Sequence, residues 1–422
     1  MGNINTPKIR FPDFKGDWIN NSLGEIAKFS KGKGISKEDI SESGETECIR
    51  YGELYTTYNE TIDTVFSKTN LDTSDLVLSE ANDIIIPASG ETQIDIAKAS
   101  CVLKSGIALG GDLNIIKSPN NGVFLSYYLN SKKKIDIAQL AQGISVVHLY
   151  AGQLSKLQLR IPSLPEQQKI ASFFTAIDQK ISQLKRKKTL LEQYKKGVMQ
   201  KIFSQKIRFK DDNGQEFPMW DKKKFGDIYS FRNNNSFSRE NLNYEKGKVK
   251  NIHYGDIHTK FNTLFDITKE VIPFINEDLQ IGRISAENYC KKGDLVFADA
   301  SEDLTDVGKS IELVNLNNEK ILSGLHTILA RPDLSKMAIG FGGYLMKSID
   351  VRKQIMKEAQ GSKVSSISAA KLSGVLLNIP VPKEQTKIAY FLSAIDNKIT
   401  HTQTQIEKAV VWKKGLMQQM FC

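Results

Sequence analysis

The sequence predicts an α+β protein that arose by tandem duplication. A globular mixed α/β domain followed by a long helix occurs twice, and the two helices pair as a coiled coil. Three observations predict this fold class: residues 161–203 align with residues 379–421 without a gap, both stretches carry an apolar heptad pattern, and shorter matched segments precede each of them. With 422 residues and 40% hydrophobic content, the chain is long enough for two domain cores.

The repeated stretch is too similar to be a coincidence of two amphipathic helices. From Glu166 to Phe203, nearly half of the residues are identical to those 218 positions later. Generic amphipathic helices would share apolar positions, but they would not also share E-Q, A-I-D-x-K-I and K-K-G. The second stretch is therefore an old copy of the first.

Each copy predicts a helix of about 40 residues, roughly 60 Å long at 1.5 Å per residue. The seam of the first helix is Ile170, Phe174, Ile177, Ile181, Leu184, Lys188, Leu191, Lys195, Val198 and Ile202. The seam of the second is Ile388, Leu392, Ile395, Ile399, Thr402, Ile406, Ala409, Lys413, Leu416 and Met420. Steps of four and three favour a coiled coil of one helix with the other. Two separate core helices remain the alternative.

Short segments before each helix also match. Ile49–Leu54 corresponds to Ile252–Ile257, Asp83–Ile86 to Asp294–Phe297, and Glu91–Lys98 to Glu302–Lys309. Apolar runs bounded by Gly, Ser, Asp and Asn are typical of strands and tight loops. We therefore expect a globular domain at 1–165, a helix at 166–206, a second globular domain at 207–383 and a helix at 384–422.

Composition narrows the class of protein. The net charge of +10 favours polyanionic partners, mainly nucleic acid. The four cysteines are widely spaced and form no C-x-x-C pair, so we expect reduced thiols and no metal site. No signal-peptide pattern and no apolar run of about 20 residues is present, so we expect a cytoplasmic protein without membrane contact.

Catalytic motifs are absent. The sequence has no G-x-x-x-x-G-K-[ST] phosphate loop, no [ND]-P-P-[YF] methyltransferase loop and no G-x-S-x-G elbow. Gly32-Lys33-Gly34 lacks the third glycine of a dinucleotide fingerprint, and we expect a loop there. The alternatives left open are a coiled-coil scaffold, and a nuclease that uses an unfamiliar acidic site such as Glu302-Asp303.

The repeated helices carry a family resemblance. P-x-x-E-Q-x-K-I-A-x-F-[FL]-[TS]-A-I-D-x-K-I stands at Pro162–Ile181 and, with Pro380 and Pro382, extends again to Ile399. This pattern resembles the conserved region of Type I restriction–modification specificity subunits, and the order of domains and helices matches over the whole chain. Lys188 and Thr402 interrupt the two seams asymmetrically, which leaves the detailed packing open.

The resemblance implies a function. Each globular domain would be a target-recognition domain that reads one half of a split site in double-stranded DNA. The helices would form an antiparallel coiled coil with pseudo-two-fold symmetry, which separates the domains and docks two methyltransferase subunits. Those subunits would use S-adenosylmethionine, and motor-nuclease subunits would cleave. This chain would then be non-catalytic and bind no cofactor. Partner contacts would fall on the repeated motif, at Glu166, Gln167, Asp178, Lys180, Glu384, Gln385, Asp396 and Lys398.

Reading bases requires donors and acceptors on loops that enter a groove. In the first domain the candidates are Ser89, Gly90, Glu91, Thr92, Gln93, Lys98, Ser145 and His148. In the second they are Ser301, Glu302, Asp303, Lys309, Lys363, Ser365 and Ser366. These loops could equally be plain turns between strands.

The positive charge is concentrated on the first helix. Residues 166–206 carry ten Lys or Arg against three Asp or Glu, and residues 384–422 carry five against three. Lys185–Lys188 could contact phosphates between the half-sites, but a solvated face or a dock for an acidic partner is slightly favoured. Because the globular domains are nearly neutral, we expect modest DNA affinity for the isolated chain.

Overall fold

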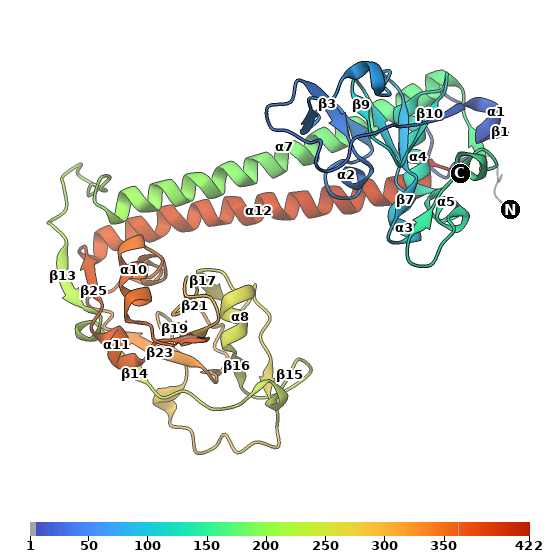
Figure 1. Cartoon of the computed structure of the whole chain (residues 1–422). Helices are drawn as coiled ribbons and strands as arrows, with labels where there is room; N and C mark the ends of the chain where they lie inside the picture. Colours follow the sequence, from blue (N-terminus) through green and yellow to red (C-terminus); the bar gives the residue numbers. More distant parts are fainter. Residues whose placement is uncertain (1–5, 362) are drawn as a thin grey trace. The chain divides into compact units, whose positions relative to one another are not determined.

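The computed structural model describes residues 6–361 and 363–422 (Figure 1). It divides into two compact units: unit 1 runs to Lys185 and resumes at Thr404, and unit 2 is Arg186–Gln403. The long helices α7 (Leu164–Phe203) and α12 (Pro382–Met420) each contribute one half to either unit. Among the described residues, no helix has the length and hydrophobicity needed to cross a bilayer.

A five-stranded sheet forms the centre of each unit. In unit 1 its order is β2 (Lys28–Lys31), β10 (Leu113–Lys117), β6 (Ile84–Pro87), β8 (Ser100–Val102), β4 (Thr61–Ile62). In unit 2 it is β14 (Tyr229–Arg232), β23 (Thr327–Pro332), β19 (Leu295–Ala298), β21 (Ser310–Asn315), β17 (Leu264–Asp266). In both sheets three antiparallel pairings are followed by one parallel pairing. The duplication read from the sequence therefore extends through both domains.

Smaller sheets repeat in the same way. In unit 1, β1 (Ile19–Ser22) pairs with β12 (Gln158–Ile161), β5 (Ser67–Thr69) and β9 (Ala108–Leu109) flank β3 (Thr46–Ile49), and β7 (Ser89–Gly90) pairs with β11 (Val147–His148). In unit 2, β13 (Asp221–Lys224) pairs with β25 (Leu376–Ile379), and β20 (Ala300–Ser301) pairs with β24 (Ser365–Ser366). The remaining sheet of unit 2 has the order β15 (Leu242–Asn243), β18 (Phe274–Ile275), β16 (Lys250–Ile252), β22 (Ile321–Ser323).

Short helices complete the two units. Those of unit 1 are α1 (Leu23–Ile26), α2 (Tyr51–Thr56), α3 (Gln93–Ile96), α4 (Gly122–Ser131), α5 (Lys134–Leu140) and α6 (Ala151–Leu154), with a 3₁₀ turn at Thr73–Asp75. Those of unit 2 are α8 (Tyr254–Thr259), α9 (Phe341–Leu345), α10 (Ile349–Glu358) and α11 (Ala369–Ser373), with 3₁₀ turns at Phe225–Asp227, Arg239–Asn241 and Ala286–Asn288.

One sequence expectation was wrong at the start of α2 and α8. The matched segments there were predicted to be strand and tight loop, yet the chain turns into a helix directly after β3 and β16. Local caps explain the change. The Glu53 carboxylate accepts a hydrogen bond from the Arg50 N–H, and His253 Nδ1 accepts one from the Gly255 N–H. Each cap satisfies a backbone donor that a helix start leaves unpaired.

The central sheets are buried on both faces, as in sheets covered by two layers. In unit 1, Ile84 and Ile86 face a core with α4 and the long helices, while Ile85 faces a second core with Ile49 and Leu54. Unit 2 repeats this arrangement around β19. The first core of each unit contains side chains of both long helices, so each domain is packed directly onto them.

The long helices end slightly earlier than predicted. They begin two residues before the expected starts, with Pro382 as the first residue of α12, where proline needs no hydrogen-bond partner for its nitrogen. After α7, Gln205 adopts a left-handed conformation with φ of 58°, which stops the helix three residues before position 206. The loop expected at Gly32-Lys33-Gly34 is present.

The two helices pair antiparallel, and α7 and α12 lie side by side in Figure 1. In unit 1 the ring of Phe174 stacks on Phe421, while Lys413 binds Asp178, so rising numbers on α7 meet falling numbers on α12. Most predicted seam residues are buried, including Thr402 at 1% exposure. This overturns the alternative of two separate core helices. Thr402 fits because its hydroxyl donates to the Lys398 carbonyl of its own helix.

Candidate nucleic-acid interface

The loops predicted to read DNA meet in each unit as a two-stranded ribbon. In unit 1 the ribbon is β7 with β11, which sets Ser89 opposite His148. In unit 2 it is β20 with β24, which sets Ser301 opposite Ser365. Segments more than 55 residues apart in sequence are thus brought together, and at equivalent places in both domains.

Two further segments are joined to each ribbon. In unit 1 the Tyr55 hydroxyl of α2 donates to the Ser89 carbonyl, and the Ala88 N–H donates to the carbonyl of Asp112. In unit 2, His258 Nε2 lies 3.0 Å from the Ala300 carbonyl oxygen, and the Asp299 N–H donates to the carbonyl of His326. We call each set of ribbon, short helix (α2 or α8) and loop (110–112 or 324–326) the ribbon face of its unit.

Burial separates the predicted residues into two groups. Ser89 and Gly90 are buried, and Ser301 and Ser365 are half-buried, so their backbone builds the ribbon. The exposed members are Glu91, Thr92, Gln93, Ser145, His148, Glu302, Asp303, Lys363 and Ser366. The exposed group alone offers side-chain donors and acceptors to a groove.

The two predicted lysines point inward. Lys98 Nζ donates to the Tyr58 carbonyl at 2.6 Å, and Lys309 Nζ donates to the His258 carbonyl at 2.8 Å. Burial lowers the pKa of Lys98. Because each ammonium group donates a hydrogen bond to a backbone carbonyl of its own domain, these lysines stabilise the ribbon face and do not point toward solvent.

The ribbon tips are exposed turns that need glycine. Gly143 and Gly361 have φ of 132° and 125°, and a Cβ on either would come within 2.0 Å of a carbonyl oxygen, that of Val146 or Val364. The tip of unit 1 carries Ile144, which is 102% exposed.

Sequence reasoning missed the aromatic and histidine side chains beside the ribbon. Tyr51 begins α2 and is 38% exposed. Its counterpart Tyr254 packs against the rings of His253, His258 and His326, with centroids 4.7, 6.3 and 5.4 Å away. Burial, followed by the charge of Arg239, lowers the pKa of His253. The signal was present in the matched R-Y-G-E and H-Y-G-D segments, which we interpreted only as domain framework.

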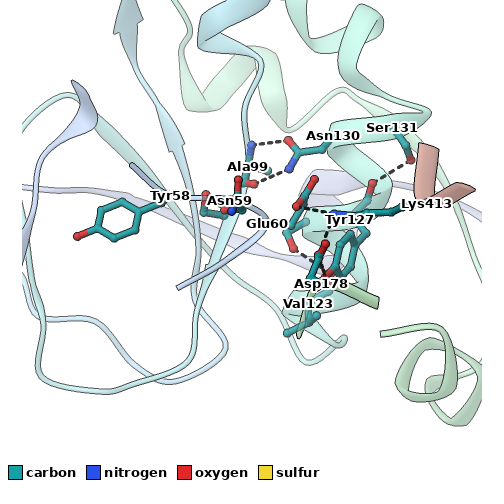
Figure 2. Close-up of polar contacts among 12 residues, drawn as sticks. Tyr58, Asn59, Glu60, Ala99, Val123, Tyr127, Asn130, Ser131, Asp178 and Lys413 are labelled. Carbon is teal, nitrogen blue, oxygen red and sulfur yellow. Dashed lines mark hydrogen bonds and ion pairs between the residues drawn. The ribbon is translucent and has the colours of Figure 1, made fainter. Parts of the chain in front are cut away.

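A cluster of charged groups holds the domain of unit 1 on both long helices (Figure 2). Asp178 of α7 accepts hydrogen bonds from the Tyr127 hydroxyl at 2.6 Å and from Lys413 Nζ of α12 at 2.8 Å. Lys413 also binds Glu60 at 3.0 Å, and its ammonium lies 5.0 Å from the centre of the Tyr127 ring. One lysine thus joins α12, α7 and the globular domain.

Unit 2 contains the same cluster at the duplicated positions. Asp396 of α12 accepts from the Tyr344 hydroxyl at 2.7 Å and from Lys195 Nζ of α7 at 2.5 Å. Lys195 lies 5.3 Å from the centre of the Tyr344 ring. We call the two sets, Tyr127–Asp178–Lys413 and Tyr344–Asp396–Lys195, the clamps. They explain why both apolar seams contain a lysine at this place.

The residues predicted to bind partners fall into three environments. Glu166, Gln167, Glu384 and Gln385 are at most 1% exposed. Arg10 and Arg208 pair with the two glutamates, and the glutamines donate to the carbonyls of Pro162 and Pro380. Asp178 and Asp396 belong to the clamps. Among these eight residues, only Lys180 and Lys398 are exposed. The structure therefore gives the E-Q pairs an internal role in place of the surface role expected from the motif.

The lysine-rich stretch of α7 is on the surface. Lys185, Arg186 and Lys187 are exposed, and Lys188 lies 3.6 Å from Glu192 one turn later. In the described ranges 6–361 and 363–422, no three His, Cys, Asp or Glu side chains gather as metal ligands.

Comparison with known proteins matches the two repeated parts. The family model described as the Type I restriction modification DNA specificity domain matches residues 15–193 and 219–410. The Type I restriction enzyme MjaVIII specificity subunit of Methanocaldococcus jannaschii is 25% identical, over 97% of this chain and 92% of its own length.

Solved structures give the same fold. The Type I restriction–modification S subunit from M. genitalium superposes with a TM-score of 0.60 at 15% identity, over 99% of both chains. A chain from a study of complex assembly and conformational transition in a Type I system superposes with a TM-score of 0.55 at 14% identity, over 96% of this chain and 97% of that one.

Proposed function

Since the chain belongs to the Type I restriction–modification DNA specificity family, we propose that it selects a two-part DNA sequence on behalf of catalytic partner subunits. Each ribbon face reads one half of the site, and the chain itself makes and breaks no covalent bond. The observation that carries the proposal is the presence of two equivalent ribbon faces, which share hydrogen bonds to the backbone but differ in exposed side chains.

The exposed residues of each face suit base edges. Glu91, Glu302 and Asp303 can accept from the amino group of cytosine, and Gln93 can bind adenine. The apolar Ile144 suits the methyl group of thymine or a wedge between base steps. Because the two faces differ, the two half-sites differ as well, and the site is not a palindrome. The buried Ser89 and Gly90 hold the ribbon and leave base reading to these neighbours.

The antiparallel helices set the distance between half-sites and dock two methyltransferase subunits that use S-adenosylmethionine. Each unit offers the partner an equivalent groove beside its clamp. Lys195, Lys196, Met199 and Gln200 line one, and their duplicated counterparts Lys413, Lys414, Met417 and Gln418 line the other. Two like grooves suit two copies of one partner. Motor-nuclease subunits then join the methyltransferases for cleavage.

Mapping of modified bases tests the proposal. Genomic DNA is sequenced for methylation from cells that carry the methyltransferase with and without this chain. We expect one split motif with an unread spacer, present only with the chain. Methylation without the chain, or a continuous motif, would contradict the proposal. Metal-dependent cleavage by the purified chain would favour the nuclease alternative, and normal methylation after deletion would favour a scaffold.

A further inference from the structure

Each ribbon face contains one non-glycine residue in the left-handed backbone region. Asp112 follows β9 with φ of 57°, and His326 follows β22 with φ of 56°. The two positions are equivalent, because Gly110 and Gly324 precede them by two residues and both donate to the carbonyl that ends the neighbouring strand, Ile49 or Ile252. Glycine is the residue that adopts this conformation without strain. Two different, non-glycine side chains at such a place point to a use for the side chain.

Both residues are tied to the ribbon through their backbone, and their side chains keep hydrogen-bonding capacity. The backbone carbonyls of Asp112 and His326 are bound by the residue just before β7 or β20, which fixes the position of each side chain beside the ribbon. The Asp112 side chain is exposed, and no hydrogen bond or ion pair engages its carboxylate within the described part of the chain.

His326 is held from two sides. Its Nδ1 lies 3.3 Å from Asp299, and its ring packs edge-on against Tyr254. The side chain is 52% exposed, and Nε2 has no hydrogen-bond partner among residues 6–361 and 363–422. One edge of the imidazole is therefore fixed by the domain and the other is open.

We propose that Asp112 and His326 are equivalent specificity-determining residues, each selecting one base pair in the half-site of its own domain. The inference rests on the proposed function. A carboxylate accepts hydrogen bonds and repels other acceptors, so Asp112 selects the exocyclic amino group of cytosine. Nδ1 of His326 faces the Asp299 carboxylate and carries a proton there, so the open Nε2 donates only from the doubly protonated imidazolium; in that form His326 selects the acceptors O6 and N7 of guanine. An acceptor in one domain and a donor at the equivalent position of the other allow two domains of the same fold to read different base pairs.

The test exchanges the two side chains in the full chain bound to its methyltransferase. A plasmid library with randomised half-sites is methylated by the complex and sequenced for modified bases. Asp112→His is expected to lower the preference for cytosine at one position of the first half-site about tenfold and to leave the second half-site unchanged. His326→Asp is expected to do the same to guanine in the second half-site only.

Two additional variants keep the test decisive. Asp112→Asn preserves the size of the side chain and removes its charge, so it reports on base choice even where the histidine variant fails to fold. Asn318→Asp is the control, because Asn318 has a similar φ of 59° but lies in the turn before β22, at the opposite end of that strand. It should leave the motif unchanged.

The outcomes separate the inference from the function on which it rests. An unchanged motif in all Asp112 and His326 variants would overturn the inference, as would equal changes in both half-sites. Loss of methylation at every sequence by an intact complex would also overturn it, because a reader of one base pair exchanges one sequence for another. If the unaltered complex selects no split motif, the proposed function itself fails.

Discussion

At the residue scale, the two domains bind the backbone N–H groups at the start of a helix with different side chains. The first N–H of α4, from Gly122, is bound by the Asn82 side chain. At the matching place in unit 2, the Glu312 carboxylate accepts from the N–H groups of Gly340 and Gly343. Glu312 is buried, and burial raises its pKa to about 7. The counterpart of Glu312 in unit 1 is Cys101, whose thiol has a pKa raised by burial to about 12.

Glu312 makes the stability of unit 2 depend on pH. The folded protein keeps this proton up to about pH 7, whereas an unfolded glutamate loses it near 4.5. The stabilisation is complete below pH 4.5 and is lost as the pH rises through 7. Between pH 5 and 8 we expect the free energy of unfolding to fall by on the order of 2 kcal/mol from this group.

Glu312→Gln, which cannot ionise, should flatten that part of the profile. Urea unfolding at a series of pH values measures the difference between the two proteins. Glu302→Gln is the matched control, because Glu302 is exposed and its substitution should keep the original slope. A slope that survives in Glu312→Gln would show that another group is responsible.

At the element scale, the sequence predicted the long helices well. Heptad spacing depends only on residues that are close in the sequence, and the same pattern occurs in both copies. Ile170 and Ile388 could therefore both be assigned to the buried seam. In the sequence, the seam lysines Lys195 and Lys413 appeared only as interruptions of the apolar pattern. Their purpose depends on Tyr127 and Tyr344, which approach from another part of the chain, and no local pattern contains that approach.

The ribbon faces were predicted only in part. The loops were found because they follow matched strands, and the pairing of β7 with β11 brings them together. Which side chains are exposed was not predictable, because the inward direction of Lys98 depends on the distant carbonyl of Tyr58. The short helices α2 and α8 were missed because two turns of helix have no periodicity to read.

The clamps should contribute unequally to stability. Lys413→Met leaves both Asp178 and Glu60 without their cation, whereas Lys195→Met leaves only Asp396. We expect losses of about 3 and about 2 kcal/mol, since half-buried carboxylates are left unpaired. Urea unfolding monitored by circular dichroism measures both.

Lys414→Met is the matched control for the clamps. Lys414 follows Lys413 on α12 but is exposed, so its replacement should change the free energy of unfolding by less than about 0.5 kcal/mol. If Lys413→Met costs no more than this control, the clamp does not stabilise the unit.

At the scale of the whole molecule, the two units are built from one plan with matched sheets, ribbons and clamps. In the proposed function the helices between the clamps measure the unread spacer. Residues 179–194 of α7 and 397–412 of α12 lie between the clamp residues of each helix. Lengthening these two stretches equally preserves the seam, because seven residues is one full repeat.

Insertion of one heptad into both stretches tests the measuring role. Seven helical residues add about 10 Å, which corresponds to about three base pairs of B-DNA. We expect the methylated motif to gain about three unread base pairs while both half-sites stay the same, as read by sequencing of modified bases. An unchanged spacer with full methylation would refute the measuring role. Insertion into one helix alone should abolish methylation, since only one clamp can then close.

The hydrogen bonds that anchor each ribbon end on main-chain carbonyls. Tyr55 in one domain and His258 in the other reach the same carbonyl although their chemistry differs. A carbonyl is present whatever side chain the residue carries, so substitutions on the ribbon leave its anchor in place. Substitutions at exposed ribbon positions can therefore accumulate without loss of folding. The ribbon is thus a surface at which the DNA sequence recognised by this protein can be changed by design.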